Sequence, residues 1–273
     1  MNGLNRGFVQ ADGFTLIELA VVVLVVTLLL GSLLIPLATQ VEQRNVSETQ
    51  KRLQEVKEAL IGYAMANGRF PCPAGTVSTD TGVEKFAAGG SSANGNCSNF
   101  FDGYVPGVTL GLSNLDAQGF VLDAWGLQQN RIRYAITNAT VGTVVNAFTR
   151  QGGSHSAGIQ ALGTPTTGAT PAGERLIYVC ASGTGSTATS CGAASNTLSN
   201  GDTVFVVYSV GKNAATSGVS GSASADEQIN LNGNPVFVSR VTSTQTGGEF
   251  DDLVAYSSRS SIVSQLVVAG QLP

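Results

Sequence analysis

Glu18 is the only ionisable side chain in an apolar stretch that runs from Phe14 to Ala38. A stretch of this length predicts a helix that crosses a bilayer, where an unpaired charge costs at least ~2.5 kcal/mol and is functional by default. The stretch contains no Lys, Arg or His, so the nearest cation would be the α-amino group made by cleaving the chain before Phe14. The sequence therefore predicts a cleavage site between Gly13 and Phe14, with Glu18 as the partner of the new N-terminus.

The segment Gly13–Glu18, with the sequence GFTLIE after a short polar leader, resembles the N-terminal signal of type IV pilins and type II secretion pseudopilins. In that family a prepilin peptidase cuts after the glycine and methylates the new N-terminal residue. The resemblance implies cleavage after Gly13, N-methylation of Phe14, and a role for Glu18 in assembly with other pilin or pseudopilin subunits. The alternatives are a plain membrane anchor and an ordinary secretory signal, whose apolar core is about 7–15 residues long. Neither alternative explains a glutamate at this depth.

These features divide the chain into a leader at 1–13, a helix at 14–67 and a globular domain at 68–273. Residues 14–38 are expected to span the bacterial inner membrane as a single pass, and residues 39–67 to form an amphipathic extension. The globular domain would then lie in the periplasm or join a periplasmic or cell-surface filament. The predicted fold class is α+β, in which the long helix packs on an antiparallel β-sheet with long glycine-rich loops, as in pilins.

Apolar side chains at helical spacing predict that one face of the extension packs on the domain. These side chains are Val46, Leu53, Val56, Leu60 and Ala64. Glu48 and Arg52 are four residues apart, in the orientation that favours a helix-stabilising ion pair. Asn67 and Gly68 are expected to end the helix.

Short runs rich in β-branched and aromatic residues predict five strands. They are expected at 131–137, 176–181, 203–210, 236–241 and 253–256. Both faces of 203–210 are apolar, which predicts a central strand with the helix on one side. Three low-complexity stretches are expected to be surface loops, at 152–173, 182–201 and 214–225. A last helix is expected within 258–269.

All four cysteines follow the apolar stretch, which would place them in an oxidising compartment. Four cysteines permit three pairings, and the sequence alone does not choose among them. Proximity favours Cys72 with Cys97 and Cys180 with Cys191, because each pair brackets a stretch rich in small and polar residues. Buried free thiols are the alternative. No Cys-x-x-Cys pair is present, so a zinc site is not expected.

Two further segments resemble motifs of the major pseudopilins. Residues 123–126 (DAWG), followed by 131–134 (RIRY), resemble a turn-and-strand motif of that family. Residues 208–213 (YSVGKN) resemble a later Ser-Leu-Gly motif. In major pseudopilins this later motif opens a calcium loop rich in aspartate, whereas here Lys212 occupies part of that loop.

Oxygen-bearing side chains recur downstream of this motif, and Ca²⁺ prefers such hard ligands. The candidate calcium ligands are Asp226, Glu227, Asp251 and Asp252, with further oxygen donors at Asn230, Asn232 and Asn234. Their spacing matches no EF-hand loop. Capping of turns by Asp and Asn side chains is the alternative interpretation. Calcium is therefore the one cofactor that the sequence suggests.

Composition and motifs argue against several classes of function. The 18 acidic and 14 basic side chains give a net charge of −4 with no basic cluster, so nucleic acid is not an expected partner. His155 is the single histidine, and there is no nucleophile elbow or phosphate loop. We therefore expect neither an enzyme nor a small-molecule substrate. The predicted function is a structural subunit of a type IV filament, as a pseudopilin-like component of type II secretion or a related system. A minor type IV pilin or a surface-displayed adhesive or binding protein is the alternative.

Overall fold

The computed structural model describes residues 13, 15–163, 177–214, 224–245 and 248–272. The predicted leader at 1–12 and the predicted methylation site Phe14 lie outside these residues. The chain divides into two units, Met1–Arg44 and Asn45–Pro273. The first helix, α1 (Leu16–Asn67), contributes to both units.

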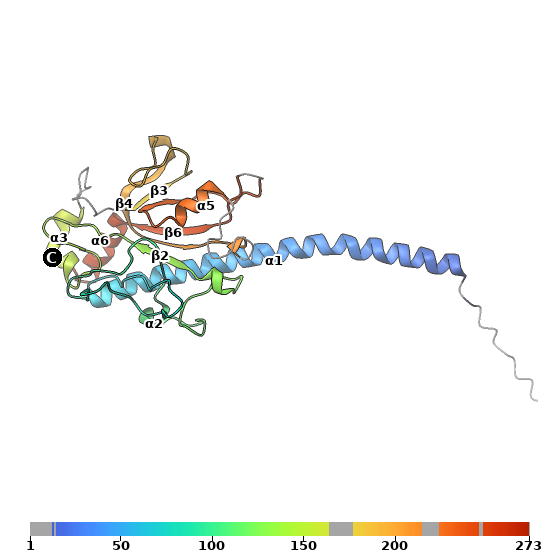
Figure 1. The fold of residues 1–273 in the computed structure, drawn as a ribbon, viewed down its shortest axis with the longest axis horizontal. Coiled ribbons are helices and arrows are strands. Elements are labelled where there is room, and N and C mark those ends of the chain that lie inside the picture. The colour runs from blue at the N-terminus through green and yellow to red at the C-terminus, as the bar shows by residue number, and fades with distance from the viewer. Residues whose placement is uncertain (1–12, 14, 164–176, 215–223, 246–247, 273) are drawn as a thin grey trace, which may run out of the picture. The chain divides into compact units, whose positions relative to one another are not determined.

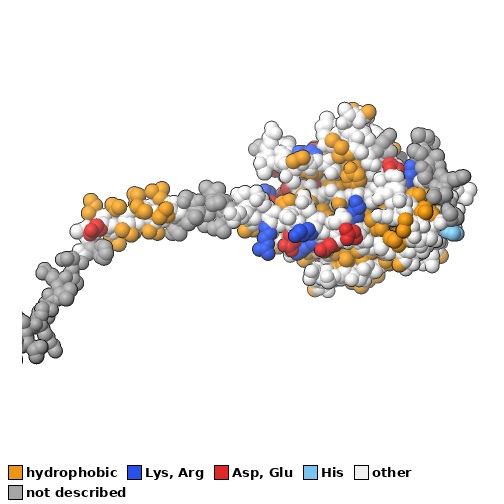
Figure 2. Space-filling model, turned by 180° about the vertical axis from the view of Figure 1, so that it is seen from behind, with side chains coloured by type: hydrophobic (Ala, Val, Ile, Leu, Met, Phe, Trp, Pro, Cys, Tyr) orange, Lys and Arg blue, Asp and Glu red, His pale blue; other side chains and the backbone are white. Residues whose placement is uncertain are grey.

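In the first unit, α1 presents large apolar side chains to solvent from Leu16 to Leu29, with exposed fractions between 45% and 87%. Figure 2 shows hydrophobic side chains around this part of the helix. Among the described residues, no helix combines the length and the apolar character needed to cross a membrane. The predictions of a transmembrane segment at 14–38 and of a single-pass inner-membrane protein are therefore wrong.

In the second unit, α1 packs one face on the sheet and ends where the sequence predicts. Leu53, Val56, Leu60 and Ala64 are buried in the main hydrophobic cluster, and Val46 packs at its edge. The same cluster contains Ile132, Tyr134, Phe205 and Val207 from the sheet region. Figure 1 shows this part of α1 running along the domain that holds the sheet. Gly68 adopts a left-handed φ of 66° directly after Asn67, which ends the helix.

One six-stranded sheet organises the domain, with the order β1-β2-β4-β3-β5 and β6 paired with β4. Its strands are β1 (Gly103–Tyr104), β2 (Arg133–Ile136), β3 (Ile177–Cys180), β4 (Thr197–Ser209), β5 (Val236–Val238) and β6 (Leu253–Ser258). All pairs are antiparallel except β3 with β5, which is parallel. The α+β class and the largely antiparallel sheet agree with the sequence.

Strand β4 is central and buried on both faces, as predicted. Phe205 and Val207 pack in the cluster that contains α1. Val206 and Tyr208 pack in a second cluster with Phe237 of β5. Each of the five predicted strands has its counterpart in the sheet, although β4 begins six residues earlier than expected, at Thr197.

Short helices complete the domain. They are α2 (Gly107–Leu110), η1 (Gln128–Asn130), α3 (Gly153–Gly163), η2 (Ala194–Asn196), α5 (Ala225–Asn230) and α6 (Arg259–Val268). Helix α6 confirms the predicted C-terminal helix. The loop prediction at 152–173 is wrong for its first half, which is α3, and the prediction at 182–201 is wrong for η2 and the start of β4. Most of the third predicted loop, residues 215–223, lies outside the described residues.

The structure contains two disulfides, and both are the pairings that proximity in sequence favoured. Cys72 and Cys97 are bonded with their Cα atoms 5.3 Å apart. Cys180 and Cys191 are bonded with their Cα atoms 5.4 Å apart. No cysteine is free, so the alternative of buried thiols is excluded.

Candidate functional site

Glu18 is hydrogen-bonded to Thr15, the residue directly before α1. Its Oε2 atom accepts hydrogen bonds from the backbone N–H and the hydroxyl of Thr15, both at 3.0 Å, while its N–H donates to Thr15 Oγ1 at 3.3 Å. This is a capping box at the first turn of α1. The hydrogen bonds from Thr15 lower the pKa of the Glu18 carboxyl. The stretch holds no cation for Glu18, as expected, but Thr15 supplies neutral hydrogen-bond donors that the sequence analysis did not anticipate.

The two segments that resemble pseudopilin motifs meet at Asp123. This buried carboxylate accepts hydrogen bonds from Asn130 Nδ2 at 3.0 Å and from Ser209 Oγ at 2.5 Å through Oδ2. Its Oδ1 accepts from the Trp125 N–H at 3.0 Å. Burial raises the pKa of Asp123, and the hydrogen bonds oppose that effect. The network fixes the turn at 123–126 to the end of β4.

Gly211 continues this network toward the acidic residues. Its N–H donates to Ser209 Oγ at 3.1 Å, and its carbonyl oxygen accepts from Asn130 Nδ2 at 2.5 Å. Its φ of 65° is left-handed, and a Cβ here would lie 2.6 Å from the carbonyl oxygen of Asp251. Only glycine therefore fits between the Asp123 network and Asp251.

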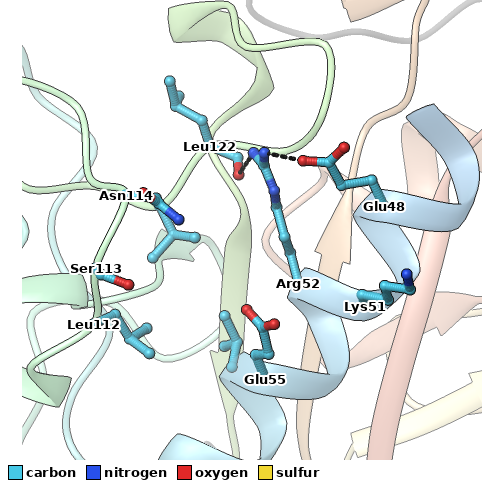
Figure 3. Close-up of a pocket in the computed structure, with 10 residues that line it drawn as sticks. Glu48, Lys51, Arg52, Glu55, Leu112, Ser113, Asn114 and Leu122 are labelled. Carbon is cyan, nitrogen blue, oxygen red and sulfur yellow. Dashed lines mark hydrogen bonds and ion pairs between the residues drawn. The ribbon is translucent and has the colours of Figure 1, made fainter. Parts of the chain in front are cut away.

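The predicted Glu48–Arg52 ion pair is present at 2.5 Å, and Arg52 has a second task. Its Nη1 atom donates to the carbonyl oxygens of Leu122 at 2.9 Å and Asp123 at 2.6 Å, which anchors the turn to α1. Arg52 lines a groove of about 180 Å³ between α1 and residues 112–122 (Figure 3). Because its guanidinium is occupied by these acceptors, we assign Arg52 to positioning the turn and not to binding a ligand.

Three of the four predicted calcium ligands lie close together, and one of them, Asp251, is next to Gly211. The carboxylates of Glu227, Asp251 and Asp252 place one oxygen each within 4.8 Å of one another, and we call these three residues the acidic cluster. Glu227 comes from the first turn of α5, where it forms a capping box with Ser224. Asp251 and Asp252 directly precede β6. Two chain segments that are separated in sequence thus supply one site.

Glu227 and Asp252 of the acidic cluster are buried, Asp251 is partly buried, and one oxygen of each aspartate lacks a hydrogen-bond donor among the described residues. Asp252 is 2% exposed, and its Oδ1 atom accepts no hydrogen bond among the described residues. The Oδ1 atom of Asp251 also lacks a donor there. Burial raises the pKa of Asp251 to about 7, and burial likewise raises the pKa of Asp252 well above its usual range. Such a cluster needs either protons or a cation to offset the repulsion between its carboxylates.

Asn213 donates hydrogen bonds to the acidic cluster, a contact that the sequence did not suggest. Its Nδ2 atom donates to Glu227 Oε2 at 3.0 Å, and its N–H donates to Asp251 Oδ2 at 3.0 Å. Asn213 ends the YSVGKN segment, and this position was the sequence feature that could have indicated its contact with the cluster. Asn230 also contacts the cluster, but as a donor from Nδ2 to Asp252 at 2.7 Å.

Asp226, the fourth predicted ligand, is not in the acidic cluster. Its Oδ2 atom pairs with Arg240 Nε at 2.7 Å, and its Oδ1 accepts from the N–H of Gly183 at 2.7 Å. Asn232 caps a turn by accepting from the N–H of Asn234 at 2.8 Å. The turn-capping interpretation is therefore correct for Asn232.

Comparison with known proteins identifies no relative from which a function could be transferred. No protein-family model matches the sequence, and no curated protein or solved structure is similar to it. The exposed apolar side chains of α1 and the acidic cluster are thus the two structural features from which a function can be argued.

The raised pKa of Asp251 predicts that the chain loses stability as the pH rises. A carboxyl with a folded pKa of about 7 holds its proton in the native state at pH values where the unfolded chain, with a pKa near ~3.9, has released it. The free energy of unfolding therefore falls between about pH 4 and pH 7. We expect a loss on the order of 1–2 kcal/mol, allowing for solvent screening of this half-buried group.

Thermal unfolding of the full-length chain in chelator, at pH 5 and pH 8, measures this dependence. The Asp251→Asn variant removes the titrating group and should give a flatter profile than the wild type. Identical profiles for the two proteins would contradict the assignment of the titration to Asp251.

Proposed function

We propose that the chain is a structural subunit of a filament of the type IV family, as a pseudopilin-like component of type II secretion or a related system. The observation that carries the proposal is the exposed apolar surface of α1 from Leu16 to Leu29, which begins at the Thr15–Glu18 capping box. A contiguous apolar surface of this kind is unfavourable in water and marks an association site. The resemblance of Gly13–Glu18 to a prepilin signal supports further copies, or related subunits, as the partner.

Glu18 gives this surface a specific contact. Its Oε1 atom accepts no hydrogen bond among the described residues, so it can receive a donor from a neighbouring subunit while Oε2 remains in the cap. Cleavage after Gly13 would give each subunit a charged amino group at Phe14. Between packed apolar helices, a charge-assisted hydrogen bond from that amino group to Glu18 is strong and directional. The pair would set the register of neighbouring helices.

Processing at Gly13–Phe14 tests the signal on which the proposal depends. Intact-mass and N-terminal peptide spectra of the chain from cells with a prepilin peptidase should show a product that begins at N-methylated Phe14. Cells without the peptidase should yield the chain with its leader. A mature chain that begins at Thr39 in both strains would support an ordinary secretory signal and contradict the proposal.

We further propose that the acidic cluster binds Ca²⁺ as a structural ion of this subunit. Glu227, Asp251 and Asp252 supply three carboxylates, and two of their oxygens lack donors. Calcium accepts such oxygens together with backbone carbonyls and water. A divalent cation would also offset the charge that Asp252 buries.

Calcium should stabilise the full-length chain, because an ion that binds only the native state shifts unfolding by mass action. At about 100 times the dissociation constant, the expected gain is about 2.7 kcal/mol, visible as a higher melting temperature. Asp252→Asn should lose this gain, whereas Asp80→Asn, a matched change outside the cluster, should retain it. No shift for the wild type at millimolar Ca²⁺ would contradict calcium binding and leave the filament proposal standing.

A further inference from the structure

The loop closed by Cys180 and Cys191 contacts α5 through Asp226. The N–H of Gly183 donates to Asp226 Oδ1 at 2.7 Å, and Ser182 Oγ lies 3.5 Å from the same atom. The other carboxylate oxygen is held by Arg240. Asp226 is the residue before Glu227, so this contact fixes the first turn of α5, from which one carboxylate of the acidic cluster projects.

The same loop approaches α5 closely at Gly183, so a larger residue there would displace the side chains of Ile229 and Asp226. A Cβ atom at Gly183 would overlap the Cδ1 atom of Ile229 and lie 2.9 Å from Asp226 Oδ1. Ile229 belongs to the same short helix and packs on the cluster that contains the disulfide. The approach of the loop to α5 is therefore specified by shape as well as by the hydrogen bond.

The disulfide shares a hydrophobic cluster with Phe250, which precedes the second segment of the acidic cluster. Cys180, Cys191 and Phe250 are buried in one small hydrophobic cluster. The Arg240 guanidinium lies 4.5 Å from the centroid of the Phe250 ring and so connects the Phe250 contact with the Asp226 contact. Phe250 is the residue before Asp251. In each of the two chain segments that form the acidic cluster, the residue before a carboxylate is thus linked to the loop: Asp226 by a hydrogen bond, and Phe250 by packing in the cluster that contains the disulfide.

We infer that the loop closed by Cys180–Cys191 is a positioning element for a cation bound at Glu227, Asp251 and Asp252, and that Asp226 positions α5 without ligating the ion. The inference rests on the proposed cation site. Three carboxylates repel one another when no cation is present. A loop that holds both segments in place keeps the ligands together, so less ordering is required when the ion binds. Cation affinity should therefore depend on this disulfide.

The test compares two disulfides in the full-length chain. Calcium titrations by calorimetry should give Cys180→Ser/Cys191→Ser an affinity at least about tenfold lower than that of the wild type, a typical effect of groups that orient metal ligands. Cys72→Ser/Cys97→Ser removes the other disulfide and should bind within about twofold of the wild type. Circular dichroism before each titration verifies that both variants are folded.

A second pair of variants addresses the loop without altering any cysteine or charge. Gly183→Ala places a methyl group against Ile229 and should lower calcium affinity several-fold. Gly248→Ala, whose added Cβ meets only one atom at 3.9 Å, is its matched control and should bind normally. Wild-type affinity in both Gly183→Ala and Cys180→Ser/Cys191→Ser would overturn the inference and leave the cation site intact. No calcium binding by the wild type would overturn the cation site, and the inference with it.

Discussion

Glu18→Gln is expected to enter filaments at least about tenfold less than the wild-type chain, although it is still cleaved and carries both disulfides. The reason is the charge. A neutral amide cannot balance the amino group of a neighbouring Phe14, and leaving one member of a buried ion pair alone typically costs 3–5 kcal/mol. Incorporation is measured by quantifying the chain in the sheared-filament fraction relative to total cell protein.

Glutamine is the informative replacement because it separates the two roles of Glu18. A capping box accepts Gln in place of Glu, so Glu18→Gln preserves the cap with Thr15 and removes only the charge. Glu18→Ala removes both, and Thr15→Ala removes the side-chain cap alone at a cost of about 0.5–2 kcal/mol. Wild-type incorporation of Glu18→Gln, with poor incorporation of Thr15→Ala, would assign Glu18 to helix capping and contradict the pairing role.

Asp123→Ala is expected to lower the free energy of unfolding by about 3–5 kcal/mol. The substitution removes the acceptor of three hydrogen bonds and leaves the Trp125 N–H and the Ser209 hydroxyl buried without it. The hydrogen bond from Arg52 to the backbone carbonyl oxygen of residue 123 remains possible in this variant, so the expected loss is that of the side-chain network.

Chemical denaturation of the full-length chain measures this loss. Asp123→Asn keeps an oxygen that can accept from the Trp125 N–H, so its loss should be smaller. Glu58→Ala, a matched carboxylate on the exposed side of α1, should change stability by less than about 0.5 kcal/mol. An equally small change for Asp123→Ala would show that the network does not support the fold.

The elements that the sequence predicted well are those encoded by local pattern. The β-branched runs at 131–137 and 203–210 contain β2 and the C-terminal part of β4. The apolar residues around Leu53 and Leu60 form the face of α1 that packs on the sheet. The disulfides were also predictable, because short sequence separations of 25 and 11 residues bring each pair together. At all of these positions, the structure favoured by the local sequence is also the one that the tertiary contacts stabilise.

The elements that were missed are short or depend on distant partners. Helix α5 has only six residues, but its start was marked by the spacing Ser224-x-x-Glu227, a capping-box signal that also occurs at Thr15 and Glu18. The exclusion of Asp226 from the acidic cluster could not be predicted, because it follows from contacts to Arg240 and Gly183 in other parts of the chain. The transmembrane prediction at 14–38 rested on apolar composition alone, and no helix among the described residues bears it out.

The central claim is that the exposed apolar surface of α1 is buried by other copies of the chain. All four native cysteines are paired, so a single new thiol at Val22, which is 52% exposed, reports on contacts of that surface alone. In cells that assemble filaments, mild oxidation of Val22→Cys should produce a disulfide-linked dimer in the sheared fraction, and Glu18→Gln in the same background should strongly reduce it. A Val22→Cys chain that remains monomeric and absent from that fraction would contradict the claim.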